Sequence, residues 1–293
     1  MADRIKVAYI AGTGKTGSTL LGKLLGQVED FVDVGELVNI DAQFDQNQKC
    51  GCGTAVRSCQ FWAEVLKKGI GGIDKLERRP WHRLKTRYLP ALLLPGARRF
   101  LVRHFHQLYR LHQAVHDVGK ARVVVDSSKS AFYGAVLNLF PGVEVYTLHL
   151  VRDVRASEGS MYRLKQEGSA KFGKRSTWWN SVRWMIVNIL TEGAAKWVGS
   201  PYRLVRYEDL TSDPKKTLGD ILDFLSEDPS KQNFIEGHTA ILGKTHTVAG
   251  SAIRFKESPI ELRLDERWRS NLPERNRAVV DGLTRWFRQR YGY

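Results

Sequence analysis

The sequence predicts an α/β fold in which a mostly parallel central sheet is flanked by helices. Short apolar runs alternate with segments of helical periodicity, as in parallel sheets that helices cover on both faces. The first apolar run leads through a glycine-rich loop into a helix, which is the opening unit of a doubly wound sheet. The 293 residues contain no internal repeat and no low-complexity linker, so we expect one domain over residues 1–293.

The predicted strands are short and rich in Val, Ile and Leu, as expected of strands that are buried on both faces. They cover Ile5–Ala11, Arg122–Asp126, Glu144–Val151 and Tyr202–Arg206, with a further short strand ahead of Asp33. The predicted helices begin near Ser18 and cover Ser130–Leu139, Asp153–Gln166 and Pro214–Leu225. Either Ser212 or Asp213 can cap the last helix, because Pro214 suits its first helical position.

Composition limits the class of protein without selecting its ligand. Hydrophobic residues make up 42% and charged residues 26% of the chain, which excludes disorder, collagen and coiled coils as descriptions of the whole. The 46 Lys and Arg outnumber the 31 Asp and Glu and give a net charge of +15, which attracts nucleic acid, anionic lipid or phosphorylated small molecules. There is no spanning apolar stretch and no signal-peptide core, and the cysteine count is odd, so we expect a cytoplasmic protein.

A basic segment, residues 77–122, interrupts the alternation of strands and helices. It holds eleven Lys or Arg, two acidic residues and five of the eight histidines. Apolar residues at helical spacing from Leu101 to Val115 predict an amphipathic helix in its second half. A helical insertion with a solvated basic face accounts for this composition; a lid over an anionic acceptor and a contact with a membrane surface are the alternatives. We find no nucleic-acid recognition motif and expect no specific nucleic-acid partner.

The loop Gly12–Thr19 has the composition of an anion site in a P-loop-like nucleotide fold. Its glycines leave backbone N–H groups to converge at the positive end of a helix dipole, and Lys15 adds a cation. A Walker A motif requires a further glycine five positions before Gly14, where Tyr9 stands. This weakens the alternative of a kinase that uses Mg-ATP and a small-molecule acceptor. A tight turn that binds nothing is the other alternative.

Two segments resemble a known family. Lys15–Leu21, with the sequence Lys-Thr-Gly-Ser-Thr-Leu-Leu, resembles the 5′-phosphosulfate loop of sulfotransferases that use 3′-phosphoadenosine 5′-phosphosulfate (PAPS). Arg152–Ser160 resembles the 3′-phosphate site of that family, in which an Arg at a strand end precedes a Ser on the next helix. The residue types suit this role, because a guanidinium and a hydroxyl can both donate hydrogen bonds to one dianionic phosphate. An arginine at a strand end with an unrelated surface serine is the alternative.

Three further segments match the family less specifically. Val124–Lys129 looks like the strand and turn beside the donor sulfate, Arg206–Leu210 like the segment near the adenine, and His246–Phe255 like the loop that closes over the nucleotide. The resemblance, in fragments from about residue 5 to 256, implies in-line transfer of a sulfuryl group to an acceptor hydroxyl, with 3′-phosphoadenosine 5′-phosphate (PAP) as the product. The nucleotide-binding residues that it implies are Gly14, Lys15, Thr16, Gly17, Ser18, Thr19, Arg152, Ser160, Tyr207, Gly250, Ser251 and Arg254. A non-catalytic protein that binds nucleotides or polyanions is the alternative outside enzymes.

The resemblance also implies catalytic roles. Lys15 would contact the oxygen that bridges sulfate and 5′-phosphate. Glu36, in an element similar to the Gly-Glu pair of the bacterial-type branch that uses a glutamate base, would be the general base; a surface acid or a partner of Lys15 is the alternative. Lys129 is a candidate cation for the sulfate or a surface lysine, and His149 is expected in the core. No metal is implied, because the donor is already activated.

The three cysteines allow two interpretations, a metal site or packed thiols. Cys50, Cys52 and Cys59 offer three sulfur ligands for a structural zinc ion, but no fourth ligand is evident in the sequence. Packed or redox-sensitive thiols are therefore the favoured interpretation.

The aromatic residues Trp178, Trp179, Trp184 and Trp197 are expected in the core, with the first two alternatively facing an acceptor pocket. The acceptor, a small molecule, lipid or glycan, would be selected by residues 77–122 and by the region around 165–185.

Overall fold

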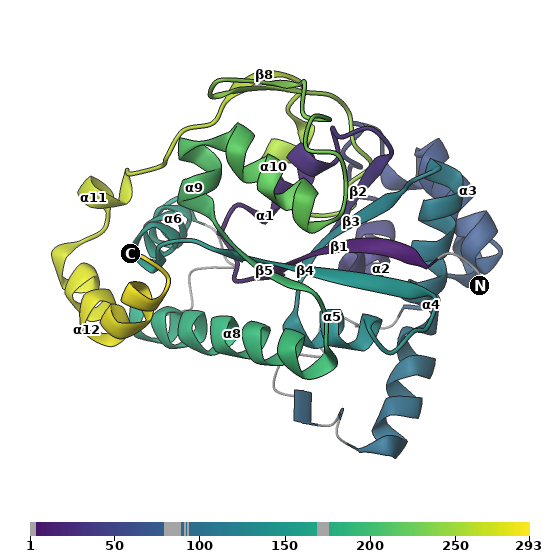
Figure 1. The fold of residues 1–293 in the computed structure, drawn as a ribbon, viewed down its shortest axis with the longest axis horizontal. Helices are drawn as coiled ribbons and strands as arrows, with labels where there is room; N and C mark the ends of the chain where they lie inside the picture. Colours follow the sequence, from purple (N-terminus) through teal and green to yellow (C-terminus); the bar gives the residue numbers. More distant parts are fainter. Residues whose placement is uncertain (1–3, 79–88, 91, 93, 169–175) are drawn as a thin grey trace.

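The central sheet confirms the predicted α/β fold. A computed structural model describes residues 4–78, 89–90, 92, 94–168 and 176–293, and the statements below concern these residues. Five parallel strands lie in the order β2-β3-β1-β4-β5 (Figure 1). Their bounds are Ile5–Gly12 for β1, Phe31–Gly35 for β2, Val123–Lys129 for β3, Val143–Val151 for β4 and Tyr202–Arg206 for β5. Each strand was predicted to within a few residues.

Strand β1 lies in the middle of the sheet because both of its faces are apolar. In the register of the sheet, Val7 lies between Val124 of β3 and Val145 of β4. Alternate residues of a strand point to opposite faces, so β1 contributes to two separate cores. Val7 and Tyr9 belong to one core, and Ala8 to the other.

Helices cover both faces of the sheet (Figure 1). Their bounds are Ser18–Leu25 for α1, Ile40–Asp45 for α2, Gln60–Ile70 for α3, Pro95–Gly119 for α4, Ala131–Leu137 for α5, Val154–Gln166 for α6, Thr177–Val198 for α8, Tyr207–Ser212 for α9, Pro214–Phe224 for α10, Trp268–Asn271 for α11 and Glu274–Arg290 for α12. Apolar residues of α3, α4 and α5 form one core with β1, and those of α1 and α10 form the other. None of the helices in the described part of the chain is both long and apolar enough to cross a membrane.

Side chains at the helix starts explain where the predicted helices begin. Ser130 caps α5, Asp153 caps α6 and Asp213 caps α10, each accepting a hydrogen bond from a backbone N–H of the first turn. The cap of α10 is therefore Asp213 and not Ser212. The amphipathic helix predicted within the basic segment is α4, whose apolar stripe is buried. Residues 79–88, 91 and 93 of that segment lie outside the described residues.

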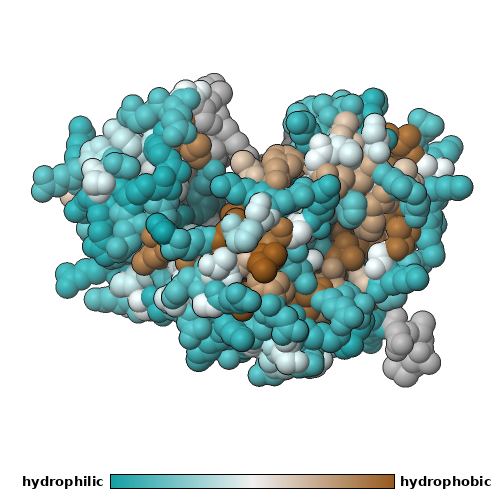
Figure 2. Space-filling model, turned by 90° about the horizontal axis from the view of Figure 1, so that it is seen from above, coloured by the Kyte–Doolittle hydropathy of each residue, from teal (hydrophilic) through white to brown (hydrophobic). Residues whose placement is uncertain are grey.

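A second, smaller sheet was not predicted. Strands β6 (Ile235–Glu236), β7 (Thr239–Leu242) and β8 (Ser258–Glu261) pair antiparallel. They contain only two to four residues, which is too short for a periodic pattern. Their buried residues join the core beneath α1 and α10. Figure 2, which views the molecule from above, shows a mostly hydrophilic face indented between two lobes.

Helix α8 corrects the expectation for the tryptophans. Trp184 is buried and donates from Nε1 to the backbone oxygen of Arg152 at 3.2 Å. Trp178, Trp179 and Trp197 are instead 52%, 48% and 41% exposed, so their assignment to the core is wrong. The buried stripe of α8 runs through Trp184, Asn188, Thr191 and Ala195, and the exposed tryptophans lie off this stripe.

The expectation that His149 belongs to the core is confirmed. Its ring is fully buried, and its two nitrogens lie 2.8 Å from the Tyr202 hydroxyl and 2.9 Å from Oδ1 of Asn188. Burial lowers the pKa of His149 to about 4, because an interior of low polarity disfavours the charged ring. His149 is therefore a neutral, buried side chain whose two ring nitrogens are both hydrogen-bonded within the core.

Candidate active site

The sequence-predicted site residues gather at one edge of the sheet. Strands β1, β3 and β4 are parallel, and the segments with Lys15, Lys129 and Arg152 occupy or follow their carboxyl ends. Ala11 at the end of β1 pairs with Lys129, and Gly35 at the end of β2 pairs with Asp126. Ligands of open α/β sheets bind outside this edge. The topology therefore brings the candidate residues together although they are far apart in the sequence.

The loop between β1 and α1 is curled by two residues in left-handed conformations. Lys15 has a φ of 70° and Gly17 a φ of 94°. The Thr16 hydroxyl donates to the backbone oxygen of Thr13 at 3.0 Å, and the Leu21 N–H donates to the Gly17 oxygen to begin α1. A Cβ atom at Gly17 would lie 2.4 Å from the Tyr207 ring. Glycine is thus required there by both conformation and space, and Tyr207 packs against the loop.

Arg152 adjoins the same loop. Its Nη1 donates to the Lys15 backbone oxygen at 3.2 Å, and its guanidinium lies 4.5 Å from the centroid of the Tyr207 ring. Its Nη2 donates to the Asp265 backbone oxygen at 3.4 Å and lies 3.7 Å from Asp265 Oδ2. The residue is 6% exposed, and its Nε has no hydrogen-bond partner among the described residues. A buried cation with an unsatisfied donor suits an anionic ligand.

Ser160 does not contact Arg152 directly in any recorded hydrogen bond. It lines a small cavity beside α6 together with Arg163, Asp265 and Arg267. Asp265 therefore adjoins both Arg152 and Ser160. Hydrogen bonding from Arg267 lowers the pKa of Asp265 to about 2, so this carboxylate is charged at neutral pH.

Segment 265–271, which ends in α11, is a part of the site that the sequence analysis missed. Its Trp268 packs so closely on α6 that a Cβ atom at Gly159 would lie 2.5 Å from the Trp268 Cβ. The Arg155 guanidinium lies 4.8 Å from the centroid of the Trp268 ring. The only signal in the sequence was the density of arginine in this segment, and it does not distinguish a binding loop from a solvated one.

Glu36 and Lys129 form an ion pair at the ends of β2 and β3. Lys129 Nζ donates to Glu36 Oε1, and Asn39 Nδ2 donates to Glu36 Oε2 at 2.9 Å. Lys129 has a φ of 68°, and its Nζ also donates to the Ser127 oxygen at 3.3 Å. About one fifth of each charged side chain is exposed. Glu36 is thus a partly accessible carboxylate whose orientation is fixed by hydrogen bonds from Lys129 and Asn39.

Two residues of the predicted closing loop reach the phosphate loop. The Ser251 N–H donates to Thr19 Oγ1 at 3.1 Å. Gly250 has a φ of 135°, and a Cβ atom there would lie 2.9 Å from the same oxygen. Arg254 is directed elsewhere, because its Nη2 donates to the Lys49 oxygen at 3.2 Å. Burial lowers the pKa of the Arg254 guanidinium.

The closing loop also supplies a neighbour for the cysteines. Cys50, Cys52, Cys59 and His246 place one ligand atom each within 4.8 Å of one another. The sequence analysis assigned His246 only to the closing loop and found no fourth ligand. His246 lies 187 positions after Cys59, so local spacing could not relate the two.

A buried carboxylate lies beneath the site. Asp33 of β2 is 2% exposed, and its Oδ1 accepts a hydrogen bond from the Gly35 N–H at 3.0 Å. Its Oδ2 has no hydrogen-bond partner among the described residues. Burial raises the pKa of Asp33 to about 7, and this effect exceeds the opposing attraction of Lys23. Asp33 is therefore partly protonated near neutral pH.

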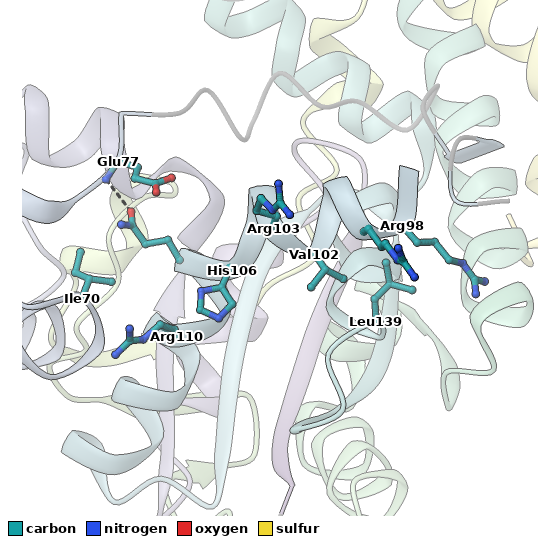
Figure 3. Close-up of a pocket in the computed structure, with 10 residues that line it drawn as sticks. Ile70, Glu77, Arg98, Val102, Arg103, His106, Arg110 and Leu139 are labelled. Atoms are coloured by element: carbon teal, nitrogen blue, oxygen red, sulfur yellow. Dashed lines mark hydrogen bonds between the residues drawn. The ribbon is translucent and has the colours of Figure 1, made fainter. Parts of the chain in front are cut away.

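The basic segment lines an open groove of about 890 Å³, which reaches Leu139 just ahead of β4. Figure 3 shows arginine side chains on successive turns of α4, with Val102 between two of them. The charged and polar residues of the groove are Glu77, Arg98, Arg99, Arg103, His106, Gln107 and Arg110. Its apolar residues are Ile70, Val102 and Leu139. The groove thus combines several cationic side chains with a few apolar ones.

Comparisons with known proteins bear on the family and the fold of the chain. The chain matches the family model described as "Sulfotransferase family" over residues 8–230. It resembles the sulfotransferase domain of the olefin synthase from Synechococcus PCC 7002, with a TM-score of 0.58 and 20% identity over 98% of this chain and 96% of that domain. It also resembles the sulfotransferase domain from the curacin biosynthetic pathway, with a TM-score of 0.50 and 15% identity over 96% of this chain and 98% of that domain.

No curated protein matches the chain. At these identities, the two structural similarities show a common fold. The family match covers well over half of the sequence and includes the phosphate loop, Glu36, Lys129 and Arg152. The chain therefore belongs to the sulfotransferase family.

Proposed function

We propose that this sulfotransferase transfers the sulfuryl group of PAPS to an acceptor hydroxyl and releases PAP. The observation that carries the proposal is the buried Arg152, which contacts the Lys15 backbone and the Tyr207 ring and retains an unpaired Nε–H. It links the phosphate loop to the candidate 3′-phosphate site. A donor that carries phosphate at both the 5′ and the 3′ position would bind to the loop and to the candidate 3′-phosphate site at once.

In the proposed mechanism, the protein mainly positions the reactants and stabilises charge on the leaving phosphate. Transfer of this kind passes through a loose in-line transition state, as in phosphoryl transfer. Lys15, the backbone N–H groups of Gly14–Thr19 and the positive end of the α1 dipole would stabilise the charge that develops on the bridging oxygen. Arg152 and Ser160 would hold the 3′-phosphate, and Tyr207, Gly250 and Ser251 would enclose the nucleotide. Arg254, whose Nη2 donates to the Lys49 oxygen, has no role in this scheme.

Glu36 is the proposed general base. Its two carboxylate oxygens are hydrogen-bonded to Lys129 and Asn39, which fixes the orientation of the group while lone pairs stay available for the acceptor proton. Lys129 is the proposed cation beside the sulfate oxygens. The attacking oxygen would bond to sulfur as the bond to the bridging oxygen breaks, and Glu36 would receive the proton. Magnesium has no role in this scheme.

Calorimetric titration of the full chain tests the donor. The ligands are PAP, adenosine 5′-phosphate, and ATP with and without Mg²⁺. The proposal predicts tight, metal-independent binding of PAP and much weaker binding of adenosine 5′-phosphate. Preference for Mg-ATP would instead favour the small-molecule kinase. Failure to bind any of the three, combined with strongly salt-dependent binding of a duplex, would favour a polyanion-binding protein.

The acceptor class is also a proposal. The groove along α4 has the charge to receive an anionic acceptor or an anionic surface, and its apolar residues can contact an apolar part of the acceptor. We therefore propose an acceptor that carries both an anionic and an apolar portion, drawn from small molecules, lipids or glycans. The region around 165–185 is the second candidate for acceptor selection, although residues 169–175 lie outside the described residues.

A further inference from the structure

We propose that Cys50, Cys52, Cys59 and His246 bind one structural zinc ion, which fastens the closing loop to the region around α3. This site is independent of the sulfuryl transfer proposed above. None of its four proposed ligands is a residue assigned to the donor or to the acceptor.

The distances between the ligand atoms match a tetrahedral site. Cys59 Sγ lies 3.4 Å and Cys50 Sγ 3.9 Å from His246 Nδ1, and Cys52 Sγ lies 3.7 Å from Cys59 Sγ. Zinc binds sulfur at about 2.3 Å and histidine nitrogen at about 2.0 Å, so tetrahedral edges are about 3.8 Å between two sulfurs and about 3.5 Å between sulfur and nitrogen. Three of the six separations thus match a tetrahedral zinc site, and all four atoms lie within 4.8 Å of one another.

Two separate pieces of backbone hold the cysteines. Cys50 and Cys52 lie in a hairpin, Lys49–Ala55, in which Lys49 and Ala55 form an antiparallel bridge and the Cys50 N–H donates to the Thr54 oxygen at 2.8 Å. Gly53, with a φ of 91°, makes the turn. Cys59 occupies the N-cap position of α3, where the positive end of the helix dipole favours a thiolate.

The histidine is held by contacts that direct Nδ1 toward the sulfurs. Its ring stacks on the Phe61 ring, with centroids 4.4 Å apart and planes 13° from parallel. Trp62 Nε1 donates to the His246 backbone oxygen at 2.8 Å, and the Gly51 N–H donates to the Thr247 oxygen at 2.9 Å. The loop, the hairpin and α3 are thus joined around the cluster by bonds that do not involve the ligand atoms.

The chemistry of the four groups selects the ion. Three thiolates and one imidazole are a known ligand set of structural zinc sites, and soft sulfur ligands disfavour magnesium and calcium. Three thiolates leave a net negative charge on the complex, which the guanidinium of Arg254 offsets from its position at the Lys49 oxygen. Cys50 and Cys59 are buried, whereas Cys52 and His246 are partly exposed, so the ion has a route of entry.

A disulfide is the competing arrangement. All three cysteines are free thiols in the structure, and the Cys52–Cys59 separation of 3.7 Å far exceeds a bond of about 2.05 Å. Oxidation of that pair would leave Cys50 and His246 without a partner of matching chemistry. The zinc site uses all four groups.

The test is the metal content of the full chain, purified under reducing conditions and measured by plasma mass spectrometry. We expect about one zinc ion per chain, and less than a tenth of that in the His246→Ala and Cys59→Ser variants. His116→Ala, which removes an exposed imidazole beside Asp117, is the matched control and should retain one ion. Absence of zinc from the unaltered chain, even after incubation with zinc chloride, or full zinc content in His246→Ala, would overturn the proposal.

X-ray absorption of the zinc-loaded, unaltered chain keeps the test decisive if the variants fail to fold. The expected first shell is three sulfur atoms and one nitrogen atom. A shell of only nitrogen and oxygen would assign the metal to another site and reject the proposal. The last check is alkylation of the thiols in the cell lysate before any reductant is added, followed by mass spectrometry. A Cys52–Cys59 disulfide in that sample would also reject the proposal.

Discussion

At the scale of single residues, three neighbours of Arg152 act in two opposite ways. The Lys15 backbone oxygen and the Tyr207 ring hold the guanidinium at the loop Gly12–Thr19. Asp265 supplies a negative charge 3.7 Å away. A bound phosphate would compete with this carboxylate for the same guanidinium. In the proposed mode of binding, the affinity for the nucleotide is therefore set by the difference between these two attractions.

The first prediction concerns Arg152→Ala. A lost charge-assisted contact costs roughly 1.5–3 kcal/mol, so we expect PAP to bind about 10- to 100-fold more weakly while adenosine 5′-phosphate changes little. Calorimetric titration of both ligands measures the difference. Arg203→Ala, which removes a guanidinium paired with Asp220, is the control. Equal weakening of both ligands would show that Arg152 does not bind the 3′-phosphate.

The second prediction concerns Glu36→Gln. The amide keeps the shape of the side chain but cannot accept the acceptor proton, so we expect kcat to fall by about 10²- to 10⁴-fold. PAP affinity should stay within about twofold, because the change lies on the acceptor side. Steady-state kinetics and titration are compared with Glu29→Gln, which alters an exposed carboxylate paired with Lys231. An unchanged kcat would remove Glu36 from the mechanism.

The third prediction uses the raised pKa of Asp33. The folded protein retains a proton up to about pH 7 that the unfolded chain releases near pH 4. The loss in the free energy of unfolding that buried Asp33 causes therefore grows between pH 4 and pH 7 and reaches its full value above pH 7. Asp33→Asn keeps the acceptor for the Gly35 N–H without the charge, so it should raise the melting temperature more at pH 8 than at pH 5. A gain that is equal at both pH values would contradict the assignment.

At the scale of secondary structure elements, the turn between β1 and α1 is defined by its glycines. Gly17 is left-handed and in contact with Tyr207, whereas a Cβ atom at Gly14 would meet no atom within 4 Å. The two glycines look alike in the sequence, and they differ in the structure by the left-handed conformation of Gly17 and by the packing of α9 against it. Their difference supplies a matched pair of variants.

The fourth prediction is that Gly17→Ala destabilises the protein and Gly14→Ala does not. The left-handed conformation costs about 1–2 kcal/mol for alanine, and the Tyr207 ring must also move. We expect the melting temperature to fall by several degrees for Gly17→Ala and to change by less than about 1 °C for Gly14→Ala. Thermal denaturation without nucleotide measures both. Equal losses would mean that contact with Tyr207 does not restrict the loop.

Elements with a strong local signal could be predicted, and those stabilised only by tertiary contacts could not. The buried strands and the capped helices α5, α6 and α10 carry apolar runs or capping side chains that act within a few residues. The short strands β6, β7 and β8 have no such signal. The same distinction applies to the site: Lys15 and Arg152 lie in local motifs, whereas the approach of His246 to Cys59 and of Asp265 to Arg152 depends on the whole fold.

At the scale of the whole molecule, the positive charge is unevenly placed. Residues 77–122 hold eleven of the 46 Lys and Arg, and several of them line the groove along α4 (Figure 3). A groove lined by several arginines favours acceptors with an anionic group, since the attraction acts over several ångströms and weakens with added salt. Net charge alone would not give this selectivity.

The fifth prediction follows from the groove. Reversing Arg99 and Arg103 to Glu should raise KM for a carboxylated aryl alcohol at least tenfold and leave KM for its neutral analogue within about twofold. Arg275→Glu with Arg285→Glu makes the same change in net charge on α12 and serves as the control. Steady-state kinetics at two salt concentrations measures the effect. Equal responses of the two acceptors would exclude an electrostatic role for the groove.

The closing loop has a consequence for how the protein is made. Strand β2 lies at the margin of the sheet, and the Val248 N–H donates to its Val34 oxygen at 3.0 Å. During synthesis, β2 leaves the ribosome long before Val248 does, and contacts between such distant residues form late. Until then the nascent chain presents an open strand edge to which another chain can add. The segment His246–Phe255, which we propose to close over the nucleotide, would therefore also protect the newly made protein from association.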